Sequence, residues 1–253
     1  MGWERSCLGE VLAVLSGKGG TGKTSVCAGI ASALAEAGKK VLCVDCDVGL
    51  RNLDISLGLT EGAALSFLDV SSGNYPLSGA ARHPLYPRLL FLTAPMNCPV
   101  EHIDGEAFRA MLRQARQEFD LILLDAPAGV DAGFRLVSSA ADRFLLVTGY
   151  GPASVRDAAR VGELLELQGK ADVRLIVNRV DRDMLSTLRT TIDDVMDNAG
   201  LPLAGIVPED PCVTLAASFG KPLLNYSPRC PAAKACRRIA RRIQGFHEPI
   251  ALR

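Results

Sequence analysis

VLAVLSGKGGTGKT (residues 11–24) joins an apolar, strand-like run to a glycine-rich turn and the start of a helix. The turn satisfies the pattern G-x-x-x-x-G-K-S/T, in which glycines free the backbone N–H groups to surround phosphates. The helix start adds the positive end of its dipole. Lys23 is expected to reach the β- and γ-phosphates, while the Thr24 hydroxyl ligates Mg²⁺. The sequence therefore predicts a nucleotide-phosphate site built from Gly17, Lys18, Gly19, Gly20, Thr21, Gly22, Lys23, Thr24 and Ser25.

The same glycines permit a second interpretation of the turn. Gly17, Gly19 and Gly22 spell G-x-G-x-x-G, the dinucleotide-binding pattern, and Asp45 ends the next apolar run. A dinucleotide turn needs neither the cation nor the hydroxyl of the Lys-Thr pair that follows. The pair therefore favours a phosphate loop, and a nicotinamide or flavin enzyme is the weaker alternative.

Composition limits the class of protein. The chain has 253 residues with 28 basic and 28 acidic side chains, which argues against a polybasic coat for nucleic acid. No apolar run approaches the ~20 residues of a membrane span, and residues 1–10 lack the apolar core of a signal peptide. Eight cysteines in a chain with a sizeable core suit a reducing cytosol. Cys43 and Cys46 lie in a strand-like run, where residues three apart face opposite sides, so buried structural thiols are favoured over a metal or redox site.

Short apolar runs alternate with helix-length amphipathic stretches along almost the whole chain. Strands are predicted at residues 11–16, 40–45, 89–93, 120–124, 144–148, 173–178 and 203–207, and helices at 23–37, 105–118, 152–168 and 186–199. This spacing predicts an α/β fold with a doubly wound, mostly parallel sheet and helices on both faces. We expect one domain over residues 1–253 with a short tail at 247–253, ligands beyond the carboxyl ends of the strands, and a surface excursion at 71–87.

Lys18 adds a second lysine to the phosphate loop and completes the deviant Walker A pattern K-G-G-x-G-K-S/T. The segment VDCDVGLRNLD (44–54) carries Asp45 and Asp47, and LILLDAPAG (121–129) carries Asp125. With these motifs the sequence closely resembles the MinD septum-site-determining ATPases of the deviant Walker A (ParA/MinD) group over residues 11–242. The run G-L-R-N-L-D resembles MinD more than it resembles plasmid-partition ParA.

The resemblance implies roles for individual residues. The residues expected to carry hydrolysis are Lys18, Lys23, Asp47 and Asp125. Lys18 would reach across a nucleotide-sandwich dimer to the partner's phosphates, and Asp47 would position the attacking water. The Mg²⁺ site would comprise Thr24, Asp45 and Asp125. The nucleotide would further contact Asn52 and, around the adenine, the strand ends that carry Asn178, Arg179, Pro208, Glu209 and Asp210.

The resemblance also implies a P-loop NTPase fold of the SIMIBI type, with Mg²⁺-dependent conversion of ATP and water to ADP and phosphate. The expected function is a spatial switch that places the division site and forms a homodimer when ATP is bound. Expected partners are a MinC-like inhibitor, a MinE- or DivIVA-linked topological partner and an anionic membrane surface, but not DNA. The protein would be cytoplasmic, or peripheral at the inner face of the cell membrane. Alternatives are a ParA-like partition ATPase, an iron–sulfur carrier or nitrogenase-reductase-like metalloprotein, and a ligase-like ATP enzyme.

Several positions depart from the family. Thr21, Ser25 and Asp131 stand where Val, Thr and Glu are usual. The segment 155–157 (VRD) opens a helix and resembles the family's dimer- and partner-binding face, although acids favour helix starts in any protein.

The C-terminal region departs further. Relatives end in a basic amphipathic membrane helix, whereas here only residues 247–253 follow the last helix candidate, 232–246. That candidate carries a basic run on one side and apolar residues on the other, so packing on the sheet is favoured over a membrane surface or DNA. The two sides are formed by Arg229, Lys234, Arg237, Arg238, Arg241 and Arg242, and by Cys236, Ile239, Ile243 and Phe246.

Overall fold

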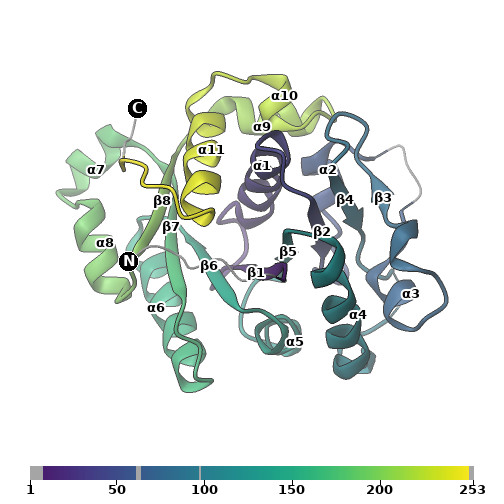
Figure 1. The fold of residues 1–253 in the computed structure, drawn as a ribbon. Coiled ribbons are helices and arrows are strands. Elements are labelled where there is room, and N and C mark those ends of the chain that lie inside the picture. Colours follow the sequence, from purple (N-terminus) through teal and green to yellow (C-terminus); the bar gives the residue numbers. More distant parts are fainter. Residues whose placement is uncertain (1–7, 61–63, 97, 251–253) are drawn as a thin grey trace.

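The protein is seen in a computed structural model that describes residues 8–60, 64–96 and 98–250. These residues form an eight-stranded sheet with the order β3-β4-β2-β5-β1-β6-β7-β8 (Figure 1). Neighbouring strands pair in parallel except at the edge, where β3 is antiparallel to β4. The strands are β1 (Glu10–Leu15), β2 (Val41–Asp45), β3 (Ala81–Arg82), β4 (Leu89–Leu92), β5 (Leu121–Asp125), β6 (Arg143–Thr148), β7 (Val173–Val180) and β8 (Leu203–Pro208).

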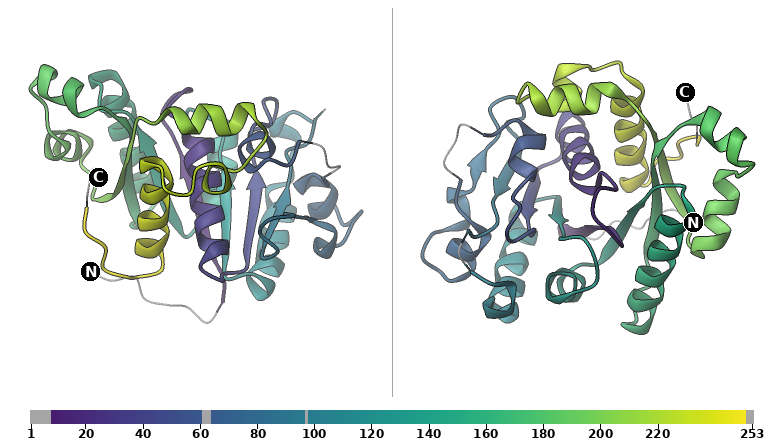
Figure 2. Two further views of the ribbon diagram at one scale, coloured as in Figure 1. Left: turned by 90° about the horizontal axis from the view of Figure 1, so that it is seen from above. Right: turned by 180° about the vertical axis from the view of Figure 1, so that it is seen from behind.

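Helices cover both faces of this sheet (Figures 1 and 2). One face packs against α1 (Lys23–Glu36), α2 (Leu53–Leu57), α9 (Pro211–Ser218), α10 (Leu223–Tyr226) and α11 (Pro231–Ile243). The other packs against α3 (Phe67–Ser71), α4 (Gly105–Glu118), α5 (Ala132–Ala140), α6 (Pro152–Leu167), α7 (Arg182–Leu188) and α8 (Ile192–Ala199). Single 3₁₀ turns lie at Leu77–Gly79 and Val100–His102. The predicted doubly wound α/β fold is confirmed.

The central strands are apolar throughout because both of their faces are covered. In β1, Val11, Ala13 and Leu15 belong to one hydrophobic core, and Leu12 and Val14 belong to the core on the opposite face. This alternation follows from the two-residue period of a strand. All the strands predicted from apolar runs are present, each with ends within two residues of the prediction. The prediction for Cys43 and Cys46 is likewise confirmed, because the two thiols are buried in opposite cores.

The segment 71–87 is more than the predicted surface excursion. It contributes the edge strand β3 and buries His83, which is 1% exposed. The His83 Nε2 bonds to the Leu57 carbonyl oxygen at 2.7 Å, and its Nδ1 accepts the amides of Leu85 and Tyr86 at 3.1 and 3.2 Å. The His83 side chain thus anchors the proline-containing segment 71–87, which has little regular secondary structure.

The single helix predicted at 186–199 is wrong, because the chain breaks there into α7 and α8. Arg189 has a left-handed φ of 49°, which ends α7. Thr191 then caps α8 through a reciprocal capping box with Asp194. The local capping chemistry outweighs the helical periodicity of the segment.

The last helix packs on the sheet, as predicted, although it spans Pro231–Ile243 and not 232–246. A Cβ built on Gly29 of α1 would come within 2.5 Å of the Cys236 Sγ, so α1 and α11 are in close contact there. The buried side of α11 comprises Ala232, Ala233, Ala235, Cys236, Ile239, Ala240 and Ile243.

Several arginines of α11 are engaged within the protein. Arg237 donates to Glu36 of α1 at 2.8 and 3.1 Å. Arg242 donates to a carbonyl oxygen of β8 at 2.6 Å, and Arg241 pairs with Glu248. Arg237 and Arg242 thus tie α11 to α1 and β8, whereas Arg241 contacts the segment that follows the helix. Among the described residues, no helix has the length and apolar character needed to cross a membrane.

Candidate functional site

The carboxyl edge of the sheet brings the loop and two acidic strand ends together. The register pairs Val14 of β1 with Asp125 of β5, and Asp125 with Asp45 of β2. The glycine-rich loop leaves β1 at this edge and starts α1 at Lys23. Ligands of doubly wound sheets bind at such an edge. The sheet itself therefore gathers the groups that the sequence singled out.

A buried ion pair lies beneath the loop. The Lys23 Nζ is 2.7 Å from the Asp125 Oδ1 and 3.3 Å from the Thr24 Oγ1. The Thr24 hydroxyl donates to the Asp125 Oδ2 at 2.7 Å. The side chains of Lys23 and Asp125 are only 6% and 1% exposed. A cation, a hydroxyl and a carboxylate thus form one hydrogen-bonded cluster that solvent barely reaches.

Burial and charge act in opposite directions on this cluster. Burial disfavours the charged form of Lys23, but the charge and hydrogen bond of Asp125 outweigh it and raise the Lys23 pKa. Burial also raises the pKa of Asp125, against the stabilising effect of Lys23 and Thr24 on its ionised form. Each charge depends on the other because water stabilises neither.

Asp45 is fully buried beside Asp125 and binds backbone. Its Oδ1 accepts the amide of Asp47 at 2.9 Å, and its Oδ2 accepts the amide of Leu53 at 3.2 Å. Burial, and then the negative charge of Asp125, raises the pKa of Asp45 to about 7. Asp47 is half-buried, and burial raises its pKa too. Asp45 therefore fixes the segment that presents Asp47 near the cluster.

The loop conformation requires glycine and is held by β7. Gly20 and Gly22 have φ angles of +79° and +83°. A Cβ on Gly22 would lie 2.3 Å from the Asn178 Nδ2. That amide nitrogen donates to the Thr21 carbonyl oxygen at 2.7 Å. Asn178, predicted to bind adenine, is thus seen to brace the phosphate loop.

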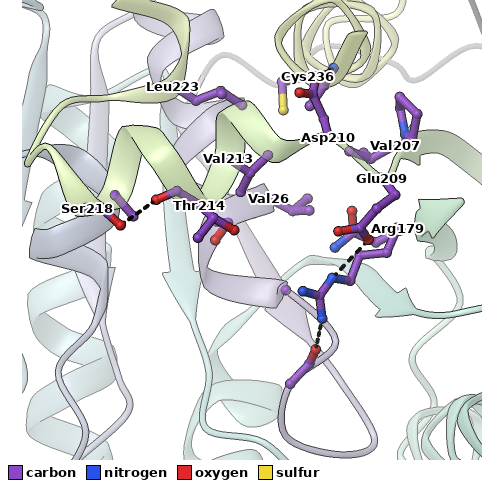
Figure 3. A pocket seen from close by; sticks show the side chains of 17 residues that line it. Val26, Arg179, Val207, Glu209, Asp210, Val213, Thr214, Ser218, Leu223 and Cys236 are labelled. Carbon is purple, nitrogen blue, oxygen red and sulfur yellow. Dashed lines mark hydrogen bonds and ion pairs between the residues drawn. The ribbon is translucent and has the colours of Figure 1, made fainter. Parts of the chain in front are cut away.

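A cavity of about 430 Å³ opens beside the loop (Figure 3). It lies between the loop, the start of α1, the ends of β7 and β8, and α9. Arg179 spans its rim, since its Nε is 3.2 Å from the Glu209 Oε2 and its Nη1 donates to the Gly20 carbonyl oxygen at 3.3 Å. The predicted residues that line the cavity are Gly20, Gly22, Ser25, Asn178, Arg179, Pro208, Glu209 and Asp210.

The sequence analysis did not predict the wall of the cavity opposite β8. Side chains of α9 and its neighbours line the cavity without belonging to any phosphate-binding motif; they include Val26, Val213, Thr214, Ala217, Ser218, Leu223 and Cys236. A local signal for α9 exists, because Asp210 accepts the Cys212 amide at 2.9 Å as a helix cap and Pro211 follows at the first helical position.

Two predicted nucleotide contacts are exposed side chains. Lys18 is exposed at the tip of the loop and makes no ion pair with any other described residue. Asn52 is exposed before α2 and is not among the residues that line the cavity. Their contacts with a nucleotide stay predictions.

The segment after β5 approaches the loop through its backbone. Gly129, with φ of +92°, donates its amide to the Ser16 carbonyl oxygen at 3.0 Å. At the start of α6, Asp157 packs so closely that a Cβ on Gly17 would lie 2.6 Å from its Cβ. Arg156 beside it is exposed. The segment after β5 and the predicted partner face at residues 155–157 therefore both border the phosphate loop.

Three known proteins are similar to this chain along nearly its whole length. The septum site-determining protein MinD of Synechocystis is 35% identical over 244 residues, covering 96% of this chain and 92% of that protein. The Aquifex aeolicus MinC:MinD cell division protein complex contains a chain that is 35% identical with a TM-score of 0.88, covering 96% and 98%. MinD of Pyrococcus horikoshii, solved with Mg-ADP, is 28% identical with a TM-score of 0.81, covering 92% and 95%.

The fold and the loop define a P-loop nucleotide-binding protein. A family model described as the CobQ/CobB/MinD/ParA nucleotide binding domain matches residues 12–223. Within that group, the chain belongs to the MinD family of septum-site-determining ATPases. It is accordingly an ATP hydrolase of cell division, and the dinucleotide, iron–sulfur and ligase-like alternatives are set aside. A ParA-like partition role stays an alternative within the same group.

Proposed function

We propose that this chain binds ATP at the carboxyl edge of its sheet and couples hydrolysis to reversible dimerisation in placing the division site. The buried cluster of Lys23, Thr24 and Asp125 carries this proposal, because a cation and a hydroxyl beneath a glycine loop suit a polyphosphate. An incoming β- or γ-phosphate would take over Lys23 from Asp125. The exchange replaces one buried charge pair by another.

The cavity beside the loop is the proposed base pocket. Its apolar walls, from Val26, Val213 and Leu223, suit the faces of a purine. The Asn178 amide and the backbone of Pro208 lie at strand ends where the edge of the base can be read. Arg179 and Glu209 close the rim as an ion pair.

Thr24, Asp125 and Asp45 would hold Mg²⁺, which neutralises phosphate charge when bound. All three offer the oxygen donors that this ion prefers. The Thr24 Oγ1 and Asp125 Oδ2 are already 2.7 Å apart, so both are within reach of one cation. Asp45 is committed to two backbone amides and would act mainly through its charge.

Asp47 is the proposed positioner of the attacking water. Its amide is held by Asp45, and its carboxyl group is half-buried near Lys23. Phosphoryl transfer asks mainly for alignment and charge stabilisation, so a fixed acceptor is sufficient for this role.

Lys18 is the proposed dimer contact. The side chain is exposed on the loop that would hold the phosphates, so it is free to reach the nucleotide of a second protomer. A cation supplied in trans would stabilise the transition-state charge only in the dimer. ATP and ADP would then differ in their affinity for the dimer, as a population switch requires.

The partners of the switch follow from its relatives and its surface. The solved complex of MinC with MinD supports a MinC-like inhibitor, and we extend this to a MinE- or DivIVA-linked partner at the face that includes Arg156. An anionic membrane is proposed only as a salt-sensitive surface contact, because the apolar side of α11 is buried. DNA is disfavoured, because Arg237 and Arg242 are engaged internally.

The test compares Lys18→Ala with Lys23→Ala, using Lys221→Ala, an exposed loop lysine, as a control. Lys23→Ala should abolish binding of a fluorescent ATP analogue. Lys18→Ala should keep that binding but lose ATP-dependent dimerisation in analytical ultracentrifugation and lose turnover. Normal dimerisation and turnover in Lys18→Ala would defeat the sandwich mechanism and leave only nucleotide binding.

A further inference from the structure

The starts of α9 and α11 bring three metal-ligating side chains together. A carboxylate oxygen of Asp210 and the sulfur atoms of Cys212 and Cys230 all lie within 4.8 Å of one another. Asp210 and Cys230 are buried, each 7% exposed, while Cys212 is half-buried. The cluster lies behind the wall of the nucleotide cavity, where Figure 3 shows Asp210 beside Cys236 of α11. None of the phosphate-binding motifs accounts for the two thiols.

Backbone amides orient two of the three ligands. The Asp210 Oδ1 accepts the Cys212 amide at 2.9 Å, and its Oδ2 accepts the Ala232 amide at 3.0 Å. The Cys230 Sγ accepts the Ala233 amide at 3.4 Å. Such hydrogen bonds to first ligands are usual in metal sites, where they fix orientation and stabilise the anionic form. Two helix N-termini add positive dipole ends to the same place.

We propose that Asp210, Cys212 and Cys230 form a binding site for a thiophilic divalent cation, with Zn²⁺ as the best fit. Two sulfur ligands favour Zn²⁺ over Mg²⁺, which takes oxygen ligands. Ligands bound at about 2.0–2.3 Å in a tetrahedron lie roughly 3.3–3.8 Å apart, so only small side-chain movements are needed. Binding would release one proton from each thiol, and water would complete the tetrahedron on the half-buried side of Cys212.

Helix capping alone does not explain these cysteines. Cys230 occupies the cap position of α11 and Cys212 lies in the first turn of α9. Serine would serve at the cap with a stronger acceptor than sulfur. The two cysteines are separated in the chain by the rest of α9 and by α10, yet both sulfur atoms lie within 4.8 Å of a carboxylate oxygen of Asp210, which suits a shared cation better. A bound cation would fasten the two ends of the segment that walls the cavity.

The test measures metal binding by reduced, nucleotide-free protein kept in excess Mg²⁺. Zn²⁺ affinity is read by competition with a chromophoric chelator, and Co²⁺ substitution reports thiolate ligands by their charge-transfer absorption. The variants are Cys212→Ser and Cys230→Ser, which keep the hydrogen-bonding shape of both helix starts. Cys98→Ser is the matched control, because Cys98 is also half-buried but lies outside the cluster.

We expect one tightly bound Zn²⁺ in the wild type and in Cys98→Ser. Loss of either cluster thiol should weaken binding by about 100-fold or more and diminish the cobalt–thiolate band. An undiminished band in both cluster variants would overturn the proposal, and so would the absence of Zn²⁺ binding by the reduced wild-type protein. Because the protein is free of nucleotide, this failure would not bear on the ATPase assignment.

Discussion

The buried pair of Lys23 and Asp125 should make a large and strongly coupled contribution to the stability of the nucleotide-free protein. At 2.7 Å and an effective dielectric constant of about 20, their attraction is about 6 kcal/mol before desolvation is subtracted. Removal of one member of such a pair typically costs about 3–5 kcal/mol. Here Asp125 can relieve part of that cost, because burial already favours its protonated form. We therefore expect Lys23→Met to lower the free energy of unfolding by about 2–4 kcal/mol.

A double-mutant cycle isolates this interaction. Lys23→Met, Asp125→Asn and their combination are unfolded in urea at pH 7.5, with EDTA and without nucleotide, and followed by circular dichroism. The double variant should be less destabilised than the sum of the single variants, with a coupling energy of about 2–3 kcal/mol. The Thr24 hydroxyl keeps a partner throughout, because Asn at 125 still offers an oxygen. A coupling below about 0.5 kcal/mol would refute the view that each charge depends on the other.

Three further predictions concern single side chains. Gly22→Ala should lose binding of a fluorescent ATP analogue, since its Cβ would lie 2.3 Å from the Asn178 Nδ2 at a φ of +83°; unchanged affinity would contradict this strain. Thr21→Val should raise the free energy of unfolding by about 1 kcal/mol, because the buried Thr21 hydroxyl has no hydrogen-bond partner in the described part of the chain; a loss of stability in urea unfolding would count against it. Burial lowers the pKa of His83 in the folded protein below its ordinary value of 6.5. As the pH falls through that value, the unfolded state therefore binds more protons than the folded state, and the free energy of unfolding decreases. The stability advantage of wild type over His83→Asn in urea unfolding should therefore shrink between pH 7.5 and 5.5, and a constant difference would speak against this origin.

The sheet and the phosphate loop could be predicted because their signals are local. Strands buried on both faces are apolar throughout, and the spacing from Gly17 to Thr24 is tied to phosphate geometry. The positions of Asp45 and Asp125 at strand ends placed both at the same edge, which the register bears out. In each of these places the local sequence alone is sufficient to predict the structure.

The features that the sequence did not predict depend mostly on contacts between segments that are distant in the chain. Nothing near His83 in the sequence indicates that the Leu57 carbonyl would bind it. The break at Arg189 depends on a left-handed residue and a cap that helical periodicity does not report. Cys212 and Cys230 come close together only once α9 and α10 have packed on the sheet. Pairwise geometry of this kind is a property of the fold and not of any motif.

The register of β2 and β5 sets which parts of the molecule can respond to the nucleotide. Asp45 and Asp125 are direct neighbours across two central strands, so their backbones are fixed about 4.8 Å apart by the hydrogen-bond ladder. Neither backbone can shift without breaking hydrogen bonds between β2 and β5 in the middle of the sheet. We therefore expect the difference between ATP and ADP to be expressed in the short segments that follow these strand ends, 46–52 and 126–131. The strand ends thus provide a fixed reference for the presence or absence of the γ-phosphate. We expect the segments that follow them to transmit that difference to a partner.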